Sequence, residues 1–167
     1  MSKLKSLRDL CLSELEDIYD AEKQIVKALP KIVKATSGSD LRNALEHHLE
    51  QTKGHVGRLE QVFQNLSVKS KGRTCHGIKG ILAEGETFLS NSEQDVVRDA
   101  GIIAASQRVE HYEMAVYGAL RTWMDELGDS SSARLLQETL DEEKEADKKL
   151  TSVATSSANS QAQAAAH

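Results

Sequence analysis

The chain has 167 residues, of which 26 are acidic and 21 basic, and its formal charge is −5. This length suits one domain with a sizeable core, and the acidic excess argues against nucleic acid as a partner. Charges recur every few residues, so we expect no signal peptide and no membrane span, and a cytoplasmic protein with reduced cysteines.

The composition and patterning predict an all-α protein, because proline occurs once and no run alternates as a strand would. Long helices are expected over residues 3–36, 41–66, 94–127 and 133–153, with Ser39 or Asp40 as the N-cap of the second. Pro30 should kink the first helix or end its regular hydrogen bonding early. A basic loop and a short amphipathic helix form a crossover between the second and third long helices. Residues 1–153 are thus expected to form the bundle, and residues 154–167 a disordered low-complexity tail.

Polar residues interrupt the apolar face of the first two long helices. Glu22 is the only charge on a stripe spaced by alternating threes and fours, which reads Leu15, Ile18, Glu22, Ile25, Leu29. His48, Thr52 and His55 occupy the centre of the next stripe. A lone histidine on an apolar face is usually a hydrogen-bonded core residue. Two histidines on one stripe are harder to explain in that way.

The last two helices carry acidic interruptions. Glu110 and Glu113 lie on the stripe Ile103, Ser106, Glu110, Glu113, Tyr117, Leu120, Met124. Buried carboxylates without a partner are costly, so the pair implies a cation, a proton or access to solvent. Alternatively, these glutamates lie at the edge of a core face formed by the neighbouring stripe Ile102, Ala105, Val109, Tyr112, Val116, Ala119, Trp123. Glu143 and Asp147 interrupt the last helix.

Two helical hairpins joined by one long connection predict a four-helix bundle with a single crossover. Because antiparallel helices rise equally, counting from the turns places Glu22 level with residue 53, between Thr52 and His55. The same count places Glu113 beside Glu143 and Glu110 level with Asp147. One belt at mid-height is therefore expected to hold a metal site of oxygen and nitrogen ligands, with the choice between the two histidines open: Glu22, His48, His55, Glu110, Glu113, Glu143 and Asp147.

Such a donor set suits iron or manganese, and helical bundles build two-metal carboxylate sites in this way. The Glu-x-x-His signature that is common in these bundles is absent from the sequence. The ligand set is therefore inferred from position.

Several segments of the chain are similar to one known family: YDAEKQ (19–24), ALPK, HLEQT (48–52), GILAEG (80–85), VRDAGIIAA, QRVEHYE (107–113) and QETLDEEK (137–144). Through them the chain resembles the YciE/YciF group of ferritin-like bacterial stress proteins. The resemblance implies a ferritin-like bundle, a homodimer and a di-iron or di-manganese centre linked to stress responses. It also implies that the metal-binding positions of the group correspond here to Glu22, His48, Glu110, Glu113, Glu143 and Asp147.

Two positions depart from the pattern of this group. Gln51 stands where the group usually has a glutamate, and His55 stands where glutamine is frequent. This exchange either preserves the number of ligands with altered geometry or weakens the site.

Two functions fit these observations. One is a metal-binding oxidoreductase or iron-handling protein, in which Tyr19, Tyr112 or Tyr117 lies close enough to share redox chemistry. The other is a non-catalytic helical dimer with a vestigial metal site, in which the acidic belt is protonated or hydrated. A DNA-protecting ferritin relative would need a basic patch, for which the sequence offers only Lys3, Lys5 and the KSKGR loop.

Overall fold

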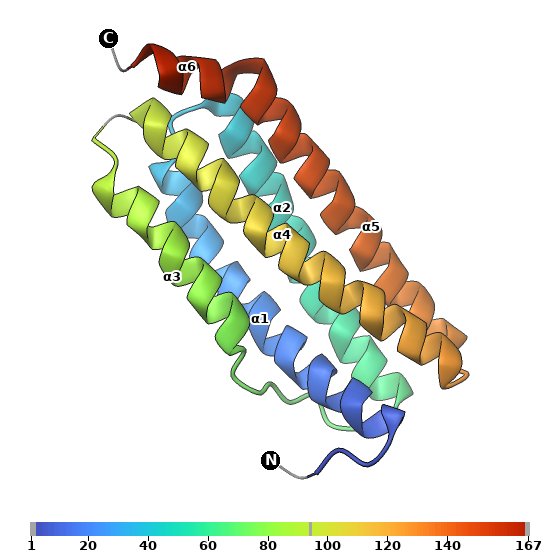
Figure 1. Cartoon of the computed structure of the whole chain (residues 1–167). Helices are drawn as coiled ribbons and strands as arrows, with labels where there is room; N and C mark the ends of the chain where they lie inside the picture. The colour runs from blue at the N-terminus through green and yellow to red at the C-terminus, as the bar shows by residue number, and fades with distance from the viewer. Residues whose placement is uncertain (1–2, 94, 166–167) are drawn as a thin grey trace.

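A computed structural model describes residues 3–93 and 95–165. Its helices are α1 (Leu7–Ala35), α2 (Ser39–Asn65), α3 (His76–Asn91), α4 (Asp95–Glu126) and α5 (Ser130–Val153), followed by the π-helical segment η1 (Ala154–Ala158) and α6 (Asn159–Ala164). The hairpins α1–α2 and α4–α5 form a four-helix bundle, and α3 lies along α1 and α4 on the crossover (Figure 1). The predicted ferritin-like bundle with a short extra helix in a single crossover is confirmed.

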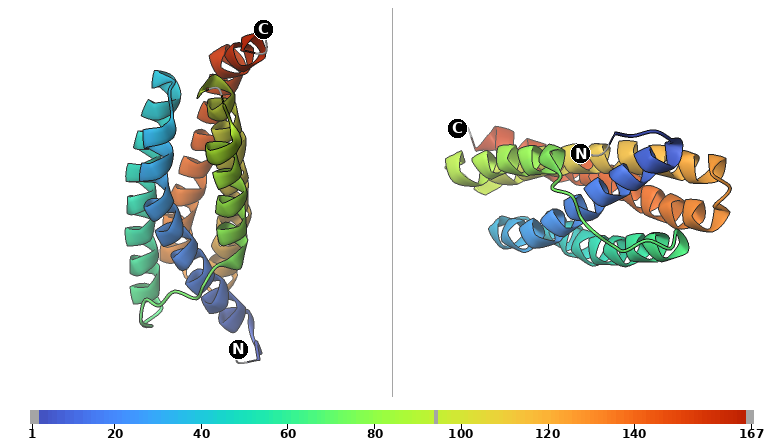
Figure 2. Two further views of the ribbon diagram at one scale, coloured as in Figure 1. Left: turned by 90° about the vertical axis from the view of Figure 1, so that its left-hand side faces the viewer. Right: turned by 90° about the horizontal axis from the view of Figure 1, so that it is seen from below.

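The two ends of the chain lie at opposite ends of the bundle, and in side view α2 is separated from α3 and α4 (Figure 2). No helix within the described ranges combines the length and the hydropathy needed to span a bilayer. The predicted helix bounds differ by a few residues, since α1 begins at Leu7 and α5 at Ser130. The predicted start of the third long helix, Gln94, lies outside the described residues.

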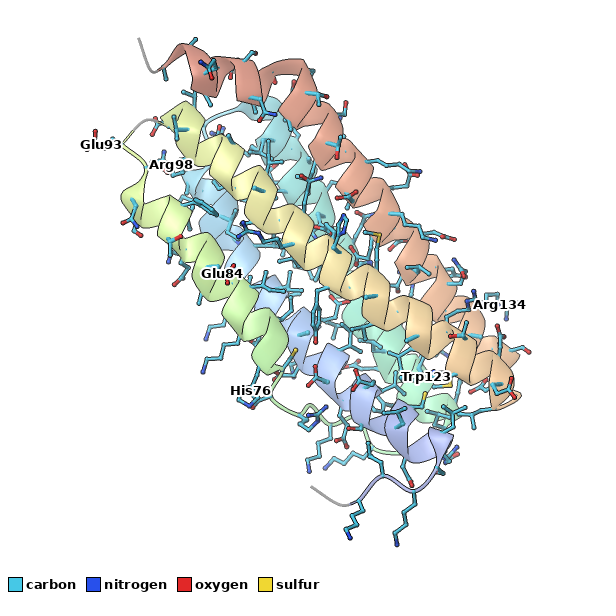
Figure 3. The ribbon with its side chains drawn as sticks, in the orientation of Figure 1. His76, Glu84, Glu93, Arg98, Trp123 and Arg134 are labelled. Atoms are coloured by element: carbon cyan, nitrogen blue, oxygen red, sulfur yellow. The ribbon has the colours of Figure 1, made fainter. Side chains whose placement is uncertain are left out.

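The acidic stripe of α4 is the face that packs into the core. Glu110 and Glu113 are 1% and 0% exposed, and Tyr117 is also fully buried. On the neighbouring stripe Val116 and Trp123 are only partly buried, and Trp123 is labelled in Figure 3. The alternative that placed the two glutamates at a solvated edge is therefore wrong.

Pro30 does not end α1, which continues to Ala35. The proline side chain is exposed, and the hydrogen bond that its missing N–H removes lies in the C-terminal part of the helix. The loss is therefore confined to a region where it interrupts little of the helix.

A carboxylate from α4, rather than a local side chain, holds the turn between α1 and α2. Gly38 is the N-cap of α2 and makes no side-chain cap bond, so the predicted cap at Ser39 or Asp40 is wrong. Asp99 accepts hydrogen bonds from the Ser37 hydroxyl at 2.6 Å, from the Gly38 N–H at 2.7 Å and from the Ser37 N–H. A Cβ at position 38 would lie 3.2 Å from the Asp99 carboxylate, which favours glycine there.

The crossover is fixed to α1 before α3 begins, and the first turn of α3 packs closely against α4. The Cys75 N–H donates to Asp20 Oδ2 at 2.8 Å, and the Arg73 N–H donates to the Glu16 carbonyl at 2.9 Å. At position 77 a Cβ would lie 2.8 Å from the Tyr112 ring, so only glycine allows this close approach. These contacts hold the start of α3 against the bundle.

The C-terminal segment corrects the expectation of a disordered tail, because residues 154–164 are helical. Ala158 and Val153 are buried, and η1 and α6 pack against α4. Alanine is the strongest helix former, so a low-complexity sequence rich in alanine does not prevent a helix that has a surface to pack on. Residues 166–167 lie outside the described residues.

Replacing Asp99 with Ala is expected to lower the free energy of unfolding by about 1–3 kcal/mol, because the backbone donors of Ser37 and Gly38 lose their charged acceptor. Urea denaturation followed by circular dichroism measures this change. Asp125→Ala is the control, since Asp125 is an exposed residue that forms an ion pair with Arg121 on its own helix. Equal losses in the two variants would contradict the clamping role of Asp99.

Candidate metal centre

Six buried side chains from the four bundle helices meet inside the bundle and form two groups, in each of which one ligand atom per residue lies within 4.8 Å of the others. The first, called the His55 group, comprises Glu22, His55, Glu113 and Glu143. The second, called the His48 group, comprises His48, Glu110, Glu113 and Glu143. Glu113 and Glu143 belong to both groups, so the two groups are adjacent.

Helix geometry explains how the chain builds two groups instead of one. His48 and His55 lie seven residues apart on one face of α2, which separates them by about 10 Å along the helix axis. Each group therefore receives one imidazole. The predicted levels are confirmed where they concern Glu22 and Glu113, because His55 Nδ1 lies 3.4 Å from Glu22 Oε1 and Glu113 shares both groups with Glu143.

Many polar atoms of these groups are close to one another but have no hydrogen-bond partner among the described residues. His55 Nδ1 lies 2.9 Å from Glu143 Oε1, and His48 Nε2 lies 3.4 Å from Glu110 Oε1, yet neither approach has the direction of a hydrogen bond. Among the described residues, both carboxylate oxygens of Glu113 and of Glu143 have no partner. Buried polar atoms are normally paired, so this cluster fits a cation that would satisfy them.

Burial sets the protonation of the carboxylates. It raises the pKa of Glu110 and of Glu113 well above the usual value, and the nearby charge of Glu143 raises both further. Burial also acts to raise the pKa of Glu143, but the contacts with His55 and Glu110 outweigh it and leave this pKa lowered. Protons therefore balance part of the acidic charge when no metal ion is bound.

The two imidazoles differ. Burial lowers the pKa of His48, so this side chain is neutral and keeps a lone pair for a metal ion. Burial also acts to lower the pKa of His55, but the contacts with Glu143 and Glu22 outweigh it and raise the pKa to about 10. A metal ion that binds His55 must displace this proton, so binding is coupled to proton release.

An ion pair on the outer side of His55 holds the imidazole in place. His55 Nε2 lies 2.8 Å from Glu142 Oε2, and Arg58 donates to both oxygens of Glu142 at 2.7 Å. A carboxylate on one ring nitrogen directs the other nitrogen toward the metal in many sites. Here it leaves Nδ1 facing Glu22 and Glu143.

The remaining predicted residues are placed as follows. Asp147 is in neither group, because its side chain accepts a hydrogen bond from Gln107 Nε2 at 2.9 Å and is 22% exposed. Thr52 donates to the His48 carbonyl oxygen at 2.7 Å, which satisfies its hydroxyl within α2. Gln51 is partly buried and lines a cavity beside His48 and Glu110. The glutamine that replaces the usual glutamate of the family therefore lies next to the two groups and not within them.

One of the three tyrosines reaches the candidate centre. The Tyr117 hydroxyl donates to Glu22 Oε1, whereas the Tyr19 hydroxyl donates to Glu60 at 2.7 Å and the Tyr112 hydroxyl to Asp17 at 3.1 Å. Tyr117 therefore orients a carboxylate of the His55 group. The other two tyrosines bond elsewhere.

Sequence reasoning missed Glu142 and Arg58. Counting levels from a turn relates helices of one hairpin, but α2 and α5 belong to different hairpins and no turn joins them. The sequence indicates these two residues only by their closeness to predicted site residues. Arg58 follows His55 by about one turn, and Glu142 is adjacent to Glu143.

In protein stripped of metal by a chelator, the free energy of unfolding is expected to fall as pH rises from 7 to 9. The stabilisation from His55 is fully present below the unfolded pKa of about 6.5 and is lost as pH rises toward the folded value of about 10. The raised pKa values of Glu110 and Glu113 act in the same direction. Each retained proton gives a slope of up to about 1.4 kcal/mol per pH unit.

The variant Glu113→Gln isolates one part of this slope. It keeps the shape of the protonated side chain but cannot ionise, so urea titrations at several pH values should show greater stability at pH 8 and a flatter decline. His48 and Glu143 titrate below this range, because their pKa values are lowered. The matched control is Glu46→Gln, at an exposed position of α2. An unchanged slope in Glu113→Gln would refute the assignment of a buried proton.

Comparison with known proteins places this chain in a family. The family model described as a domain of unknown function (DUF892) matches residues 6–163. Protein YciF of Escherichia coli (strain K12) is 42% identical over 161 residues, which are 96% of this chain and 97% of that protein.

Solved structures agree with this assignment. The crystal structure of the E. coli stress protein YciF has a TM-score of 0.89 and 42% identity, covering 93% of this chain and 99% of that one. YcfI from Rhodopseudomonas palustris, described as a structural protein, has a TM-score of 0.88 and 42% identity, covering 90% and 96%. A protein from Xanthomonas campestris pv. campestris, at 20% identity over 89% and 91% of the two chains and a TM-score of 0.72, shows likeness of fold alone. The chain therefore belongs to the DUF892 family, and it is similar to the stress protein YciF of E. coli.

Proposed function

We propose that this protein binds two iron or manganese ions in the bundle and acts as a redox or iron-handling protein in a stress response. The observation that carries this proposal is the sharing of Glu113 and Glu143 by two groups, with no hydrogen-bond partner for any of their four oxygens among the residues that the structure describes. A carboxylate has two oxygens and can therefore bridge two ions. Paired groups that share carboxylates are the arrangement of dinuclear sites in helical bundles.

The donor set favours iron or manganese. Each group offers three carboxylates and one imidazole, and among the described residues no thiolate lies in either group. Carboxylate and imidazole ligands suit Mn and Fe better than the soft metals that thiolates select. When bound, such a centre supplies redox chemistry toward oxygen or peroxide.

The chain itself contributes orientation, and around the His55 group it also excludes water. Glu142 fixes His55, Tyr117 donates to Glu22, and aliphatic residues such as Leu15, Ile18 and Leu59 are fully buried in the surrounding core. A dry, rigid surrounding strengthens electrostatic interactions with the bound ions.

The physiological part of the proposal is supported by similarity. The E. coli relative is described as a stress protein, and this chain matches it over nearly its whole length. A homodimer in the cytoplasm is part of the same proposal. Cys11 and Cys75 are free and buried, in agreement with a reducing compartment.

A second candidate is a non-catalytic helical protein in which the cluster holds protons. The raised pKa values of Glu110 and Glu113 favour it, since protons can replace metal ions in balancing the acidic charge. The description of the R. palustris relative as a structural protein points the same way.

Metal content separates the two candidates. Purified protein loaded with Fe(II) or Mn(II) is expected to hold about two ions per chain by elemental analysis, and to change absorbance when Fe(II) is added in air. Glu113→Gln should lose both ions because both groups share this residue, whereas Glu110→Gln should retain about one. The control Glu46→Gln should match the wild type. Protein that takes up no metal and shows no absorbance change would favour the second candidate.

Glu142→Ala tests the orientation of His55. Metal affinity is expected to fall about 10- to 100-fold, since the imidazole loses the acceptor that directs Nδ1 inward. Competition with a chromophoric chelator measures this affinity. Glu138→Ala is the control, because Glu138 also lies near Arg58, at 3.6 Å, but does not contact His55. Equal affinity in both variants would show that Glu142 has no positioning role.

A further inference from the structure

A cavity of about 510 Å³ lies between α1, α3 and α4, which run side by side in Figure 1. Its walls are aliphatic and come from all three helices, including Ile25, Leu29, Ile81, Leu82, Ile102 and Val109. In Figure 3, His76 and Glu84 mark the position of α3. A cavity of this size and character is within the range of small-molecule sites.

The inner end of the cavity is polar and adjoins the candidate metal centre. His48 and Glu110 line it, and both side chains are buried. Neither ring nitrogen of His48 has a hydrogen-bond partner among the described residues. The cavity thus connects the outside of the bundle with the His48 group.

The outer end of the cavity carries positive charge. Lys27, Lys31 and Lys79 line it and are exposed. Lys31 forms an ion pair with Glu86 at 2.9 Å, and no ion pair is found for Lys27 or Lys79 in the described part of the chain. An anionic group at this rim would therefore meet cations that are not already neutralised.

A second cavity, of about 380 Å³, reaches His48 and Glu110 from another side, and its lining includes the polar residues Asp40, His47, Gln51 and Glu145. A metal ion or water can approach the centre past these polar side chains. The aliphatic cavity is therefore not required for their entry. Its walls favour a different kind of occupant.

We infer that the aliphatic cavity binds a small amphipathic molecule with an aliphatic chain and an anionic head group. The chain lies between α1, α3 and α4, where its burial is favourable. The head stays at the lysine rim, because the lysines that line the cavity lie there and because solvent at the rim spares the charged head the cost of burial. If the proposed function holds, the end of the chain lies next to the metal ions.

The surface argues for a small molecule over a protein partner. The large apolar side chains that are exposed in the described residues are Leu4, Val97 and Leu127, and none of them lines this cavity. A docking face for protein would present such side chains to solvent. Here Ile81, Leu82 and Leu89 are partly covered within the fold.

Dodecanoate is a suitable probe, and isothermal titration below its micelle concentration measures its binding to the full chain. About one molecule per chain is expected to bind, and dodecyltrimethylammonium, which has an equal chain and opposite charge, should bind at least about tenfold more weakly. Equal binding of the two probes, or no binding of dodecanoate, would overturn the inference.

Two sets of variants locate the site. Ala28→Phe fills the cavity from α1 and should abolish binding, while Ala115→Phe, at an exposed position of α4 outside both cavities, should not. Lys27→Glu with Lys79→Glu changes only exposed positions and should weaken binding at least about tenfold by reversing the charge of the rim. Lys53→Glu with Lys148→Glu is the matched control. Binding that is indifferent to both sets would refute the location.

Oligomeric state and metal content complete the test. If Ala28→Phe converts a wild-type oligomer into monomers, a second copy of the chain covers the cavity and the inference is wrong. Titrations of metal-stripped and metal-loaded protein keep the two proposals apart. Dodecanoate binding without metal uptake would support this inference alone, and metal uptake without dodecanoate binding would support only the proposed function.

Discussion

The burial of four carboxylates in one small volume is the constraint on which the rest of the structure depends. Like charges at such distances cannot all remain ionised in a dry interior, so cations or protons must accompany them. His55 supplies part of this compensation, since its raised pKa keeps the imidazole charged beside Glu22 and Glu143. The contacts around the cluster hold its side chains in one geometry.

Those contacts come from several directions. Tyr117 donates to Glu22 from α4, and the Arg58–Glu142 pair holds His55 between α2 and α5. A cluster left to its own electrostatics would relax by rotating its side chains toward water. Packing and fixed hydrogen bonds oppose this relaxation. Keeping the carboxylates buried lowers the stability of the fold, which is the usual cost of a preorganised site.

The parts of the fold and site that could be predicted from sequence rest on helix periodicity. Stripes spaced by threes and fours identify the core faces, and equal rise in a hairpin relates Glu22 to His55 and Glu113 to Glu143. Periodicity also indicated that two histidines on one stripe mattered, although not that they would divide between two groups.

The rest depends on contacts that local pattern does not encode. Asp99 holds the turn before α2, some 60 residues earlier in the chain, and Glu142 meets Arg58 across a pair of helices that no turn joins. Asp147 has the spacing of a ligand, but its carboxylate bonds to Gln107 instead. The helical tail depends on the surface that α4 and α5 offer it, which composition alone does not reveal.

The distribution of the six residues over the chain has a mechanical consequence. The first hairpin contributes Glu22, His48 and His55, and the second contributes Glu110, Glu113 and Glu143, so both groups draw on both hairpins. Ions bound there would act as a cross-link between two halves that are otherwise joined covalently only through the crossover. Separating the hairpins would then require breaking coordination bonds, and the bundle would open as a single cooperative unit instead of hairpin by hairpin.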